Sequence, residues 1–329
     1  LWPSTTEPQA WDFFSTLPID RLLVSFRSEN ETAATINRLA SWIDTLNDDG
    51  RLAGVRLAID WPLSMELAPE LEKWAKDAHI DLVLSVHGRA QIEHLERIET
   101  EAKKKIGRSV VIKAALKTDS FKTLSVFHEW MMASRSTRVF LPMTETESST
   151  AIQTSLAKPA LWSWYRLWSG PSAPLGLGFW REDTGSSLDQ PTFSMWWRRR
   201  RFKTATFAAV LGQPVHHSQT PMIHDRFFSE RGLWVTAIPL GKTEPVDEAL
   251  KLLIKMGLKA AAVTAPLKEQ IASIVNEAGP INTLAVIDQK IVTTNTDGDG
   301  FAKLWMSAGE FAKRLGLKFD ETGEGCVVW

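Results

Sequence analysis

Alternation of strands and helices over the first 200 residues constrains the fold of this chain more than any other feature. Short β-rich runs alternate there with amphipathic helical stretches such as residues 91–106, whose apolar residues recur at spacings of three or four. Alternation of this kind implies parallel strands joined by crossover helices, so we predict an α/β fold. The predicted strands are residues 22–26, 55–59, 82–86, 110–114, 138–141 and 175–179.

The polar residues that follow these strands favour a (β/α)8 barrel over an open sheet. Arg27 follows the first strand, His87 follows the third, and Lys113 lies near the end of the fourth. In a barrel such strand ends converge on one face, where a neutral lysine can attack a ketone and a histidine can move protons. The three residues predict a site for carbonyl chemistry, although ordinary loop-edge residues would give the same spacing.

Composition excludes several classes of partner. The 329 residues are 44% hydrophobic, enough for one large core or two ordinary ones. A net charge of -1 and a pI of about 6.7 point to no nucleic-acid or membrane-surface partner. The one cysteine, Cys326, fits a reducing cytoplasm and excludes a multi-cysteine zinc site. We therefore expect small-molecule substrates, no metal, no membrane span and a cytoplasmic location.

A tryptophan-rich stretch precedes the predicted boundary between two domains. Six of the 15 tryptophans lie between Trp162 and Trp197, and residues 198–201 are four consecutive arginines. Arginines interleaved with aromatic rings could hold an anionic partner. A net charge near zero instead favours a solvated helix end beside tryptophans that cover the underside of the first domain. The change in composition places the boundary near residue 203.

The second half predicts a compact α/β unit of about 110 residues. Its predicted strands are 207–211, 234–239 and 260–263, with a hairpin over 282–286 and 291–293. Its predicted helices are 222–231, 246–256, 269–276 and 301–315. Thr220 is the expected N-cap of the first helix, and Pro221 is expected at its first position.

Short polar motifs end the strands of this second unit. Thr264 and Lys268 follow the third strand, and Asp297 lies in a turn-like Asn-Thr-Asp-Gly stretch. Ser218 and Thr220 precede the first helix. Strand ends of an open α/β sheet hold its ligand site. Hydroxyls gathered with a lysine and a carboxylate predict a site for a small polyhydroxylated molecule, because each ring hydroxyl needs a polar partner.

Three stretches of the first half, residues 23–31, 85–87 and 110–114, occur in the order and approximate spacing of a known family. They resemble type I 3-dehydroquinate dehydratase. The resemblance implies an incomplete (β/α)8 TIM barrel in which Lys113 forms a Schiff base with 3-dehydroquinate and His87 acts as general acid and base. The substrate-binding residues that it implies are Arg27, Glu31, Arg166, Ser186 and Gln190.

Several positions depart from that family's pattern. Gly88 follows His87 where the family has an acidic residue, and residues 185–190 keep only the serine and glutamine of its lid motif. The family's first two strands have no counterpart, so we expect the chain to begin inside the barrel. Missing strands leave unpaired edges, and we expect this chain to dehydrate its substrate poorly.

A second and more specific set of motifs covers residues 207–301: Ser-Gln-Thr, Val-Thr-Ala-Pro-Leu-Lys, Ile-Asn-Thr and Asn-Thr-Asp-Gly. They resemble the substrate-binding domain of shikimate dehydrogenase. The resemblance implies that Lys268 and Asp297 form a dyad that exchanges the proton of the reacting hydroxyl, while NADP(H) exchanges hydride. The substrate-binding residues that it implies are Ser218, Thr220, Thr264 and Asn282.

The NADP-binding domain of that family should follow, opening with a strand and a Gly-rich turn. Residues 325–329 look like its first strand, but no Gly-x-Gly-x-x-Gly follows, so we assign no cofactor-binding residue. The predicted domains are 1–203, a dehydratase-like barrel without its first strands; 204–316, the substrate-binding domain; and 317–329, the start of the NADP-binding domain.

Together the two resemblances imply a bifunctional enzyme of the shikimate pathway. Its first domain would convert 3-dehydroquinate to 3-dehydroshikimate through a lysine Schiff base, and its second would reduce that product to shikimate with NADPH. A non-catalytic quinate or shikimate sensor, as in fungal quinate-pathway repressors, and a quinate dehydrogenase are the alternatives. The retained Lys113, His87, Lys268 and Asp297 argue against the sensor, because binding alone needs no Schiff-base lysine.

Overall fold

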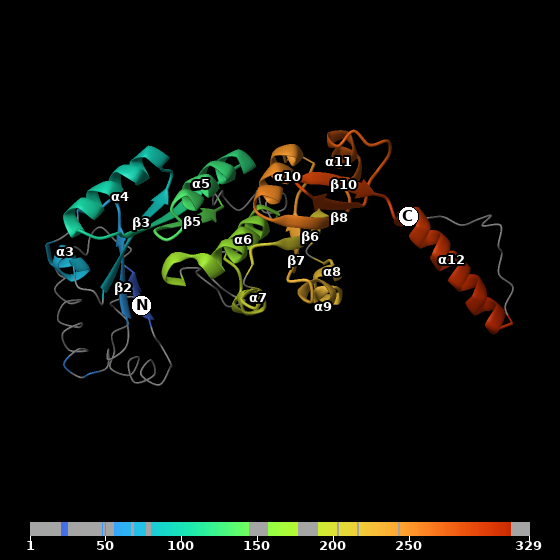
Figure 1. Cartoon of the computed structure of the whole chain (residues 1–329), viewed down its shortest axis with the longest axis horizontal. Coiled ribbons are helices and arrows are strands. Elements are labelled where there is room, and N and C mark those ends of the chain that lie inside the picture. The colour runs from blue at the N-terminus through green and yellow to red at the C-terminus, as the bar shows by residue number, and fades with distance from the viewer. Residues whose placement is uncertain are drawn as a thin grey trace, which may run out of the picture. The chain divides into compact units, whose positions relative to one another are not determined.

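The computed structural model describes residues 21–25, 48, 50, 56–66, 69–76, 80–144, 157–176, 190–202, 204–215, 217–242 and 244–316. The chain divides into two compact units, Leu1–Arg201 and Phe202–Trp329 (Figure 1). In its described residues, each unit contains one five-stranded sheet. Within the described ranges, no helix is long and apolar enough to cross a membrane.

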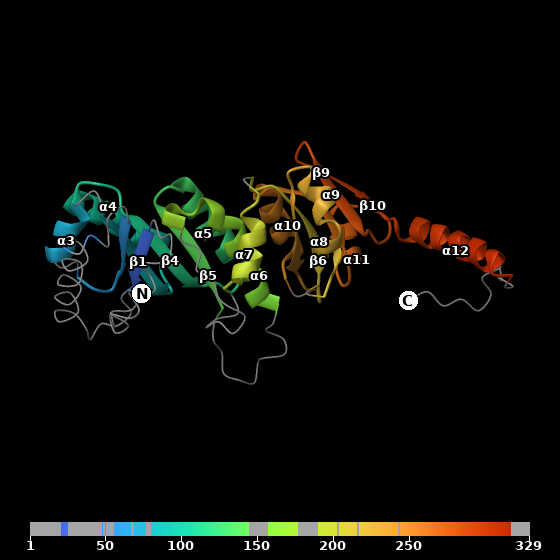
Figure 2. The same ribbon diagram turned by 90° about the horizontal axis from the view of Figure 1, so that it is seen from below.

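The first unit is built on a parallel sheet whose strands lie in chain order. The strands are β1 (Arg21–Ser25), β2 (Arg56–Pro62), β3 (Ile80–Gly88), β4 (Val111–Lys117) and β5 (Arg138–Met143). Helices between them supply the crossovers that parallel neighbours need. These are α3 (Pro69–Lys76), α4 (Ile92–Ile106) and α5 (Phe121–Ala133), and α4 and α5 lie on the same side of the sheet (Figure 2). The predicted α/β fold with a parallel sheet is confirmed.

Local sequence explains where the covering helices begin and end. The buried stripe of α4 consists of Leu95, Ala102 and Ile106. Gly107 ends this helix, because its φ of 77° lets the amide donate to the Lys103 carbonyl at 2.8 Å. Helix α5 begins after Ser120, whose Oγ accepts from the Thr123 amide at 3.2 Å.

The other face of this sheet carries its own apolar cluster. The cluster consists of Val83, Val111, Ala115, Val139 and Leu141, and Leu23, Met143, Ala173 and Leu175 pack against it. Leu175 belongs to the 3-10 turn η4 (Pro174–Gly176), which follows α6 (Ala157–Ser169) and η3 (Gly170–Ser172). Its φ of 56° is a turn conformation, so the prediction that a sixth strand begins at Leu175 is wrong. Residues 177–179 of that predicted strand lie outside the described residues.

The α6 part of the tryptophan-rich stretch is buried, whereas Trp197 of α7 (Phe193–Arg199) is exposed. The α6 residues Trp162, Trp164 and Trp168 are at most 2% exposed, and α7 packs against α6. Of the four consecutive arginines, three are exposed, as predicted for a solvated helix end, but Arg199 is 2% exposed. Burial, and then the charge of Arg135, lowers the pKa of Arg199 to about 10.

The second unit is built on a mixed sheet with the order β10-β9-β8-β6-β7. Its strands are β6 (Phe207–Gly212), β7 (Trp234–Pro239), β8 (Leu258–Val263), β9 (Thr283–Ile287) and β10 (Lys290–Thr294). β6 runs parallel to both β7 and β8, and β9 pairs antiparallel with β8 and β10. The predicted hairpin is therefore confirmed as β9–β10.

Two of the four predicted helices of this unit are confirmed closely, as α10 (Val246–Lys255) and α11 (Lys268–Ile274). The prediction of one helix over 222–231 is wrong. Two short helices, α8 (Thr220–Ile223) and α9 (Asp225–Ser229), replace it, because His224 between them has non-helical angles of φ -95° and ψ 4°. Thr220 is already helical, so the N-cap is Gln219 and not Thr220 as predicted.

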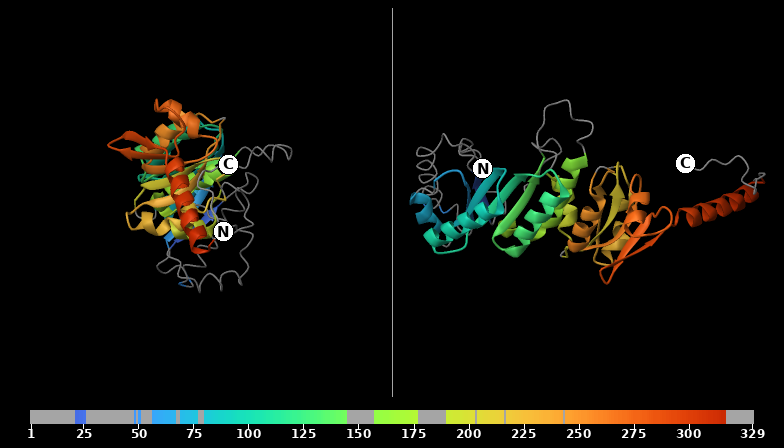
Figure 3. Two further views of the ribbon diagram at one scale, coloured as in Figure 1. Left: turned by 90° about the vertical axis from the view of Figure 1, so that its right-hand side faces the viewer. Right: turned by 90° about the horizontal axis from the view of Figure 1, so that it is seen from above.

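The last described helix, α12 (Asp297–Arg314), begins at Asp297 rather than at residue 301 as predicted. It follows the end of β10 (Figure 3). Several of its apolar side chains are exposed, among them Phe301, Leu304, Met306 and Phe311. The early start places the Asp297 carboxylate in the first turn, where the positive end of the helix macrodipole stabilises it.

Candidate functional site

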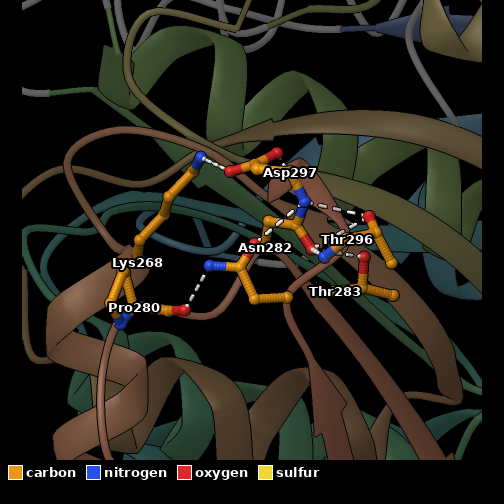
Figure 4. A network of polar contacts seen from close by, with 7 residues as sticks. Lys268, Pro280, Asn282, Thr283, Thr296 and Asp297 are labelled. Carbon is orange, nitrogen blue, oxygen red and sulfur yellow. Dashed lines mark hydrogen bonds and ion pairs between the residues drawn. The ribbon is translucent and has the colours of Figure 1, made fainter. Parts of the chain in front are cut away.

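Two helix starts bring a lysine and a carboxylate together in the second unit (Figure 4). Lys268 is the first residue of α11, after the turn that follows β8, and Asp297 is the first residue of α12, after β10. The Lys268 ammonium donates a hydrogen bond to Oδ2 of Asp297. The two side chains are 33% and 54% exposed, so the pair is accessible to a ligand.

Asn282 holds the other oxygen of the Asp297 carboxylate. Its Nδ2 donates to Oδ1 of Asp297 at 2.6 Å and to Oγ1 of Thr296 at 3.0 Å. Its Oδ1 accepts from the Thr296 amide at 3.0 Å and from Oγ1 of Thr283 at 2.9 Å. Both ends of the Asn282 amide are thus bonded, which fixes the side chain in one orientation.

Hydrogen bonds also keep Asp297 ionised. The bond from Lys268, then the bond from Asn282, lower the pKa of Asp297 below its ordinary value, and burial opposes them. An ionised carboxylate holds the neighbouring ammonium in place as a charged donor. This arrangement can supply a proton to an oxygen on which negative charge develops, and can take the proton back.

A close backbone approach shapes the turn that carries Thr264. The Thr264 amide donates to the Leu211 carbonyl at 2.9 Å, and the Gln213 amide donates to the Ala265 carbonyl at 3.0 Å. A Cβ on Gly212 would lie 2.4 Å from Cγ2 of Thr264 and 2.7 Å from the Ala265 oxygen. No side chain therefore fits there unless the turn moves. Sequence reasoning misses Gly212, whose only signal is a glycine directly after a predicted strand.

The predicted hydroxyls Ser218 and Thr220 lie at the start of α8. Oγ of Ser218 accepts from the Thr220 amide at 3.3 Å, and both side chains are half-buried. Helix α8 contacts β6 and β7. Within the part of the chain that the structure describes, no hydrogen bond joins either hydroxyl to Lys268 or Asp297, so their role in one shared site stays a prediction.

In the first unit, Lys113 and His87 lie on one face of the sheet. Lys113 pairs in register with Ser85, and His87 lies two residues beyond Ser85 on β3. Side chains two residues apart on a strand share a face, so both point to the side of the cluster that contains Val83 and Val111. Lys113 is 4% exposed, whereas His87 is exposed. The two predicted catalytic residues thus lie at adjacent levels of neighbouring strands.

A buried carboxylate that sequence reasoning misses lies beside Lys113. The Lys113 ammonium donates to Oδ2 of Asp60, and the same oxygen accepts from Oγ of Ser25 at 3.2 Å. Asp60 is 2% exposed. It lies 53 residues before Lys113, and the register of β2, β3 and β4 brings the two together. Its only sequence signal is a lone carboxylate directly after a predicted apolar strand.

The other predicted residues of the first unit are described in part. Arg166 of α6 is 3% exposed and donates from Nη2 to the Pro142 carbonyl at 2.9 Å, at the carboxyl end of β5. Gln190 is half-buried. The predicted Arg27, Glu31 and Ser186 lie outside the described residues. No group of three or more His, Cys, Asp or Glu side chains in the described ranges could hold a metal ion.

Comparison with known proteins finds similarity in the second unit. Residues 210–284 match the family model described as the shikimate dehydrogenase substrate binding domain. The shikimate dehydrogenase (NADP(+)) of Acidiphilium cryptum is 37% identical over 106 residues, which are 30% of this chain and 38% of that protein. The enzyme of the same name from Rubrobacter xylanophilus is 31% identical over 133 residues, which are 37% of this chain and 47% of that protein.

A solved structure aligns with more of the chain. The alignment with the dehydroquinate dehydratase and shikimate dehydrogenase from S. pombe covers 93% of this chain and 58% of that chain, at 15% identity and a TM-score of 0.39. The chain spans 38% and 47% of the two curated relatives named above. The family match includes Lys268 and Asn282 and ends before Asp297.

Proposed function

We propose that the second unit binds 3-dehydroshikimate and shikimate, and that Lys268 and Asp297 exchange the proton of the reacting hydroxyl. The observation that carries this proposal is the Lys268–Asp297–Asn282 network, which lies within and just beyond the residues that match the family model. The network occupies strand ends, where open α/β sheets hold their ligands. The names of the curated relatives support the choice of substrate.

The proposed chemistry follows from the charges of the pair. Reduction of the ketone places negative charge on its oxygen, and the Lys268 ammonium stabilises that charge and delivers the proton. Asp297 orients the ammonium, and Asn282 orients Asp297, so the pair needs little rearrangement during the reaction. The proposed partners of the remaining hydroxyls and of the ring carboxylate are Ser218, Thr220 and Thr264.

NADP is the proposed hydride carrier, because the curated relatives are named as NADP(+) enzymes. A dinucleotide diphosphate is commonly held by a Gly-rich turn at a helix N-terminus. The glycines at the start of α12, Gly298 and Gly300, do not fit that role, since Asp297 and Asp299 beside them would repel a diphosphate. We therefore assign none of the described residues to NADP.

The variant Lys268→Met tests the proposal. Shikimate binding, measured by calorimetry, should change little. In a protein that also carries the expected NADP-binding domain, NADP(+)-dependent oxidation of shikimate should fall by about 10² to 10⁴, because the proton-transfer group is lost. Lys251→Met is the matched control, since Lys251 forms an exposed pair with Asp247 at 3.6 Å, and it should change neither quantity. Full turnover by Lys268→Met, or no shikimate binding by the unaltered protein, would contradict the proposal.

A second activity is favoured by the buried lysine of the first unit. We propose that this unit dehydrates 3-dehydroquinate to 3-dehydroshikimate through a Schiff base on Lys113, with His87 as general acid and base. Lysines shielded from water are the amines that enzymes use for Schiff bases, and Lys113 is 4% exposed on the face that carries His87. The product of this reaction would be the substrate of the second unit.

Borohydride trapping with 3-dehydroquinate, followed by peptide mass mapping, tests this second activity. The adduct should map to Lys113 and should disappear in Lys113→Met. Lys117→Met removes an exposed lysine from the same strand and should leave the adduct unchanged. An adduct on another lysine would contradict the assignment of Lys113.

Quinate dehydrogenation and ligand sensing are the alternatives to these activities. Parallel measurements of affinity and turnover with shikimate and with quinate separate them. With the expected NADP-binding domain present, faster turnover of quinate would identify a quinate dehydrogenase, and tight binding without turnover of either ligand would identify a sensor. For both proposed activities we propose a cytoplasmic setting, on the ground of the single cysteine.

A further inference from the structure

Asp60 is a buried carboxylate to which the proposed dehydration assigns no role. Its Oδ2 accepts from the Lys113 ammonium and from the Ser25 hydroxyl. Its Oδ1 is also buried and has no hydrogen-bond partner within the described part of the chain. An oxygen in this position can accept a proton or a further donor, which the bonded oxygen cannot do as easily.

Stabilisation of the folded protein does not explain why this ion pair is buried. Removing two charges from water costs more free energy than their attraction returns unless the hydrogen bonding is excellent, and apolar pairs of similar volume often replace such pairs without loss. The ion pair lies on the face that also carries the apolar cluster of Val83 and Val111. A reaction that needs a positive charge on the Lys113 nitrogen gives the pair a function at this place.

We infer that Asp60 is the counterion of the Schiff base on Lys113. We also infer that it protonates the carbinolamine hydroxyl, which leaves as water when the Schiff base forms. This inference rests on the proposed dehydration by the first unit. A protonated Schiff base carries its charge on the same nitrogen as the free lysine. The carboxylate that pairs with the ammonium is therefore already in place to pair with the iminium.

Protons and electrons balance with these two residues. The Lys113 ammonium passes one proton to Asp60, and the nitrogen lone pair forms a bond to the ketone carbon while the C=O π pair moves to oxygen. A proton then moves from nitrogen to that oxygen, which gives a neutral carbinolamine. Asp60 returns its proton to the hydroxyl, the C–O bond breaks, water leaves, and the nitrogen lone pair forms the C=N bond. The products are an iminium cation, water and the Asp60 carboxylate.

Quantitative borohydride trapping in Asp60 variants tests the inference. Asp60→Asn keeps the shape of the side chain but cannot carry a negative charge or return a proton, so trapped Lys113 adduct should fall about a hundredfold. Asp60→Glu keeps the carboxylate and should retain most of the adduct. Sodium formate should raise the adduct in Asp60→Ala, where it can replace the missing carboxylate, but not in Asp60→Asn, where the amide fills the space.

The matched control is Asp81→Asn on the neighbouring strand β3. Asp81 also belongs to an ion pair, with Arg56 at 2.6 Å, and its replacement should leave the Lys113 adduct unchanged. Circular dichroism shows which variants are folded. If Asp60→Asn does not fold, the amount of adduct formed by Asp60→Glu tests the inference instead. The inference is overturned by a folded Asp60→Asn that forms adduct like the unaltered protein, or by a folded Asp60→Glu that forms none.

A reaction independent of substrate separates this inference from the proposed activity. Formaldehyde forms an iminium with a lysine, and borohydride reduces it to methyl-lysine. If the unaltered protein forms no adduct with 3-dehydroquinate, the proposed dehydration fails, and the formaldehyde reaction then tests Asp60 alone. Methylation of Lys113 relative to the exposed Lys117 should be lower in Asp60→Asn. Equal ratios in the two proteins would overturn the inference.

Discussion

Each unit of this protein pairs a lysine with an aspartate, and the two pairs differ in their contact with water. The side chains of Lys113 and Asp60 are 5% and 3% exposed, whereas those of Lys268 and Asp297 are 33% and 54% exposed. Water screens the exposed pair, so removing either partner should change the free energy of unfolding only slightly. In the buried pair, loss of one partner leaves a buried charge without its counterion. The buried pair should therefore affect the free energy of unfolding strongly, and the exposed pair should hardly affect it.

The largest difference should appear in the stability of variants that break each pair. Asp60→Ala should lower the free energy of unfolding by about 3–5 kcal/mol, because it removes the counterion of the buried Lys113 ammonium. The double variant Asp60→Leu with Lys113→Met should recover most of that loss, since no charge remains. Urea unfolding followed by tryptophan fluorescence measures both. A loss below about 1 kcal/mol for Asp60→Ala would show that the pair is solvated after all.

Breaking the exposed pair should have a much smaller effect on stability. Lys268→Ala should change the free energy of unfolding by less than about 1 kcal/mol, because both partners keep contact with water. Lys251→Ala, which breaks the exposed pair with Asp247, provides the reference for a surface ion pair. If Lys268→Ala destabilised the protein as much as Asp60→Ala, the contrast between the two units would not hold.

The smallest effect is expected in the titration of Asp297. Its lowered pKa makes a contribution to stability that is present above the unfolded value of 3.8 and is lost as the pH falls through the folded pKa. Lys268→Ala removes the largest cause and should raise the pKa of Asp297, and Asn282→Ala should raise it less. Carboxyl carbon chemical shifts followed by NMR give the midpoints. Identical midpoints in the three proteins would rule out the hydrogen bonds as the cause.

Hydrophobic periodicity was sufficient to predict most of the described strands and helices. All six residues of β6 are buried, as expected for its continuous apolar run, and α10 buries apolar residues at helical spacing. The spacing of the buried apolar residues therefore indicates whether a segment forms a strand or a helix. Lys268 could be predicted for a related reason, since it follows the end of a short apolar strand. Lys113 lies inside β4, and its prediction depended on the resemblance to a known family. Local sequence carries this information because neighbouring residues of one element share one environment.

The features that sequence reasoning misses depend on distant residues. Asp60 meets Lys113 only through the register of three strands, which no local pattern encodes. The Asn-Thr-Asp-Gly stretch is typical of a turn, yet Asp297 starts a helix there, because Asn282 supplies bonds from another strand end. Leu175 resembles the start of a strand, but it packs on the first sheet from a 3-10 turn.

The tight approach at Gly212 has a consequence for how the ligand preference of the second unit could evolve. Any larger residue at this position would displace the end of β6 or the turn that carries Thr264, so a single substitution there would disturb two segments of the proposed site. Ser218 and Thr220 lie instead at the start of a four-residue helix, where one small side chain can replace another without moving a strand. If Ser218 and Thr220 bind the ligand as proposed, its specificity can change at these two positions, whereas a larger residue at position 212 requires the turn to move.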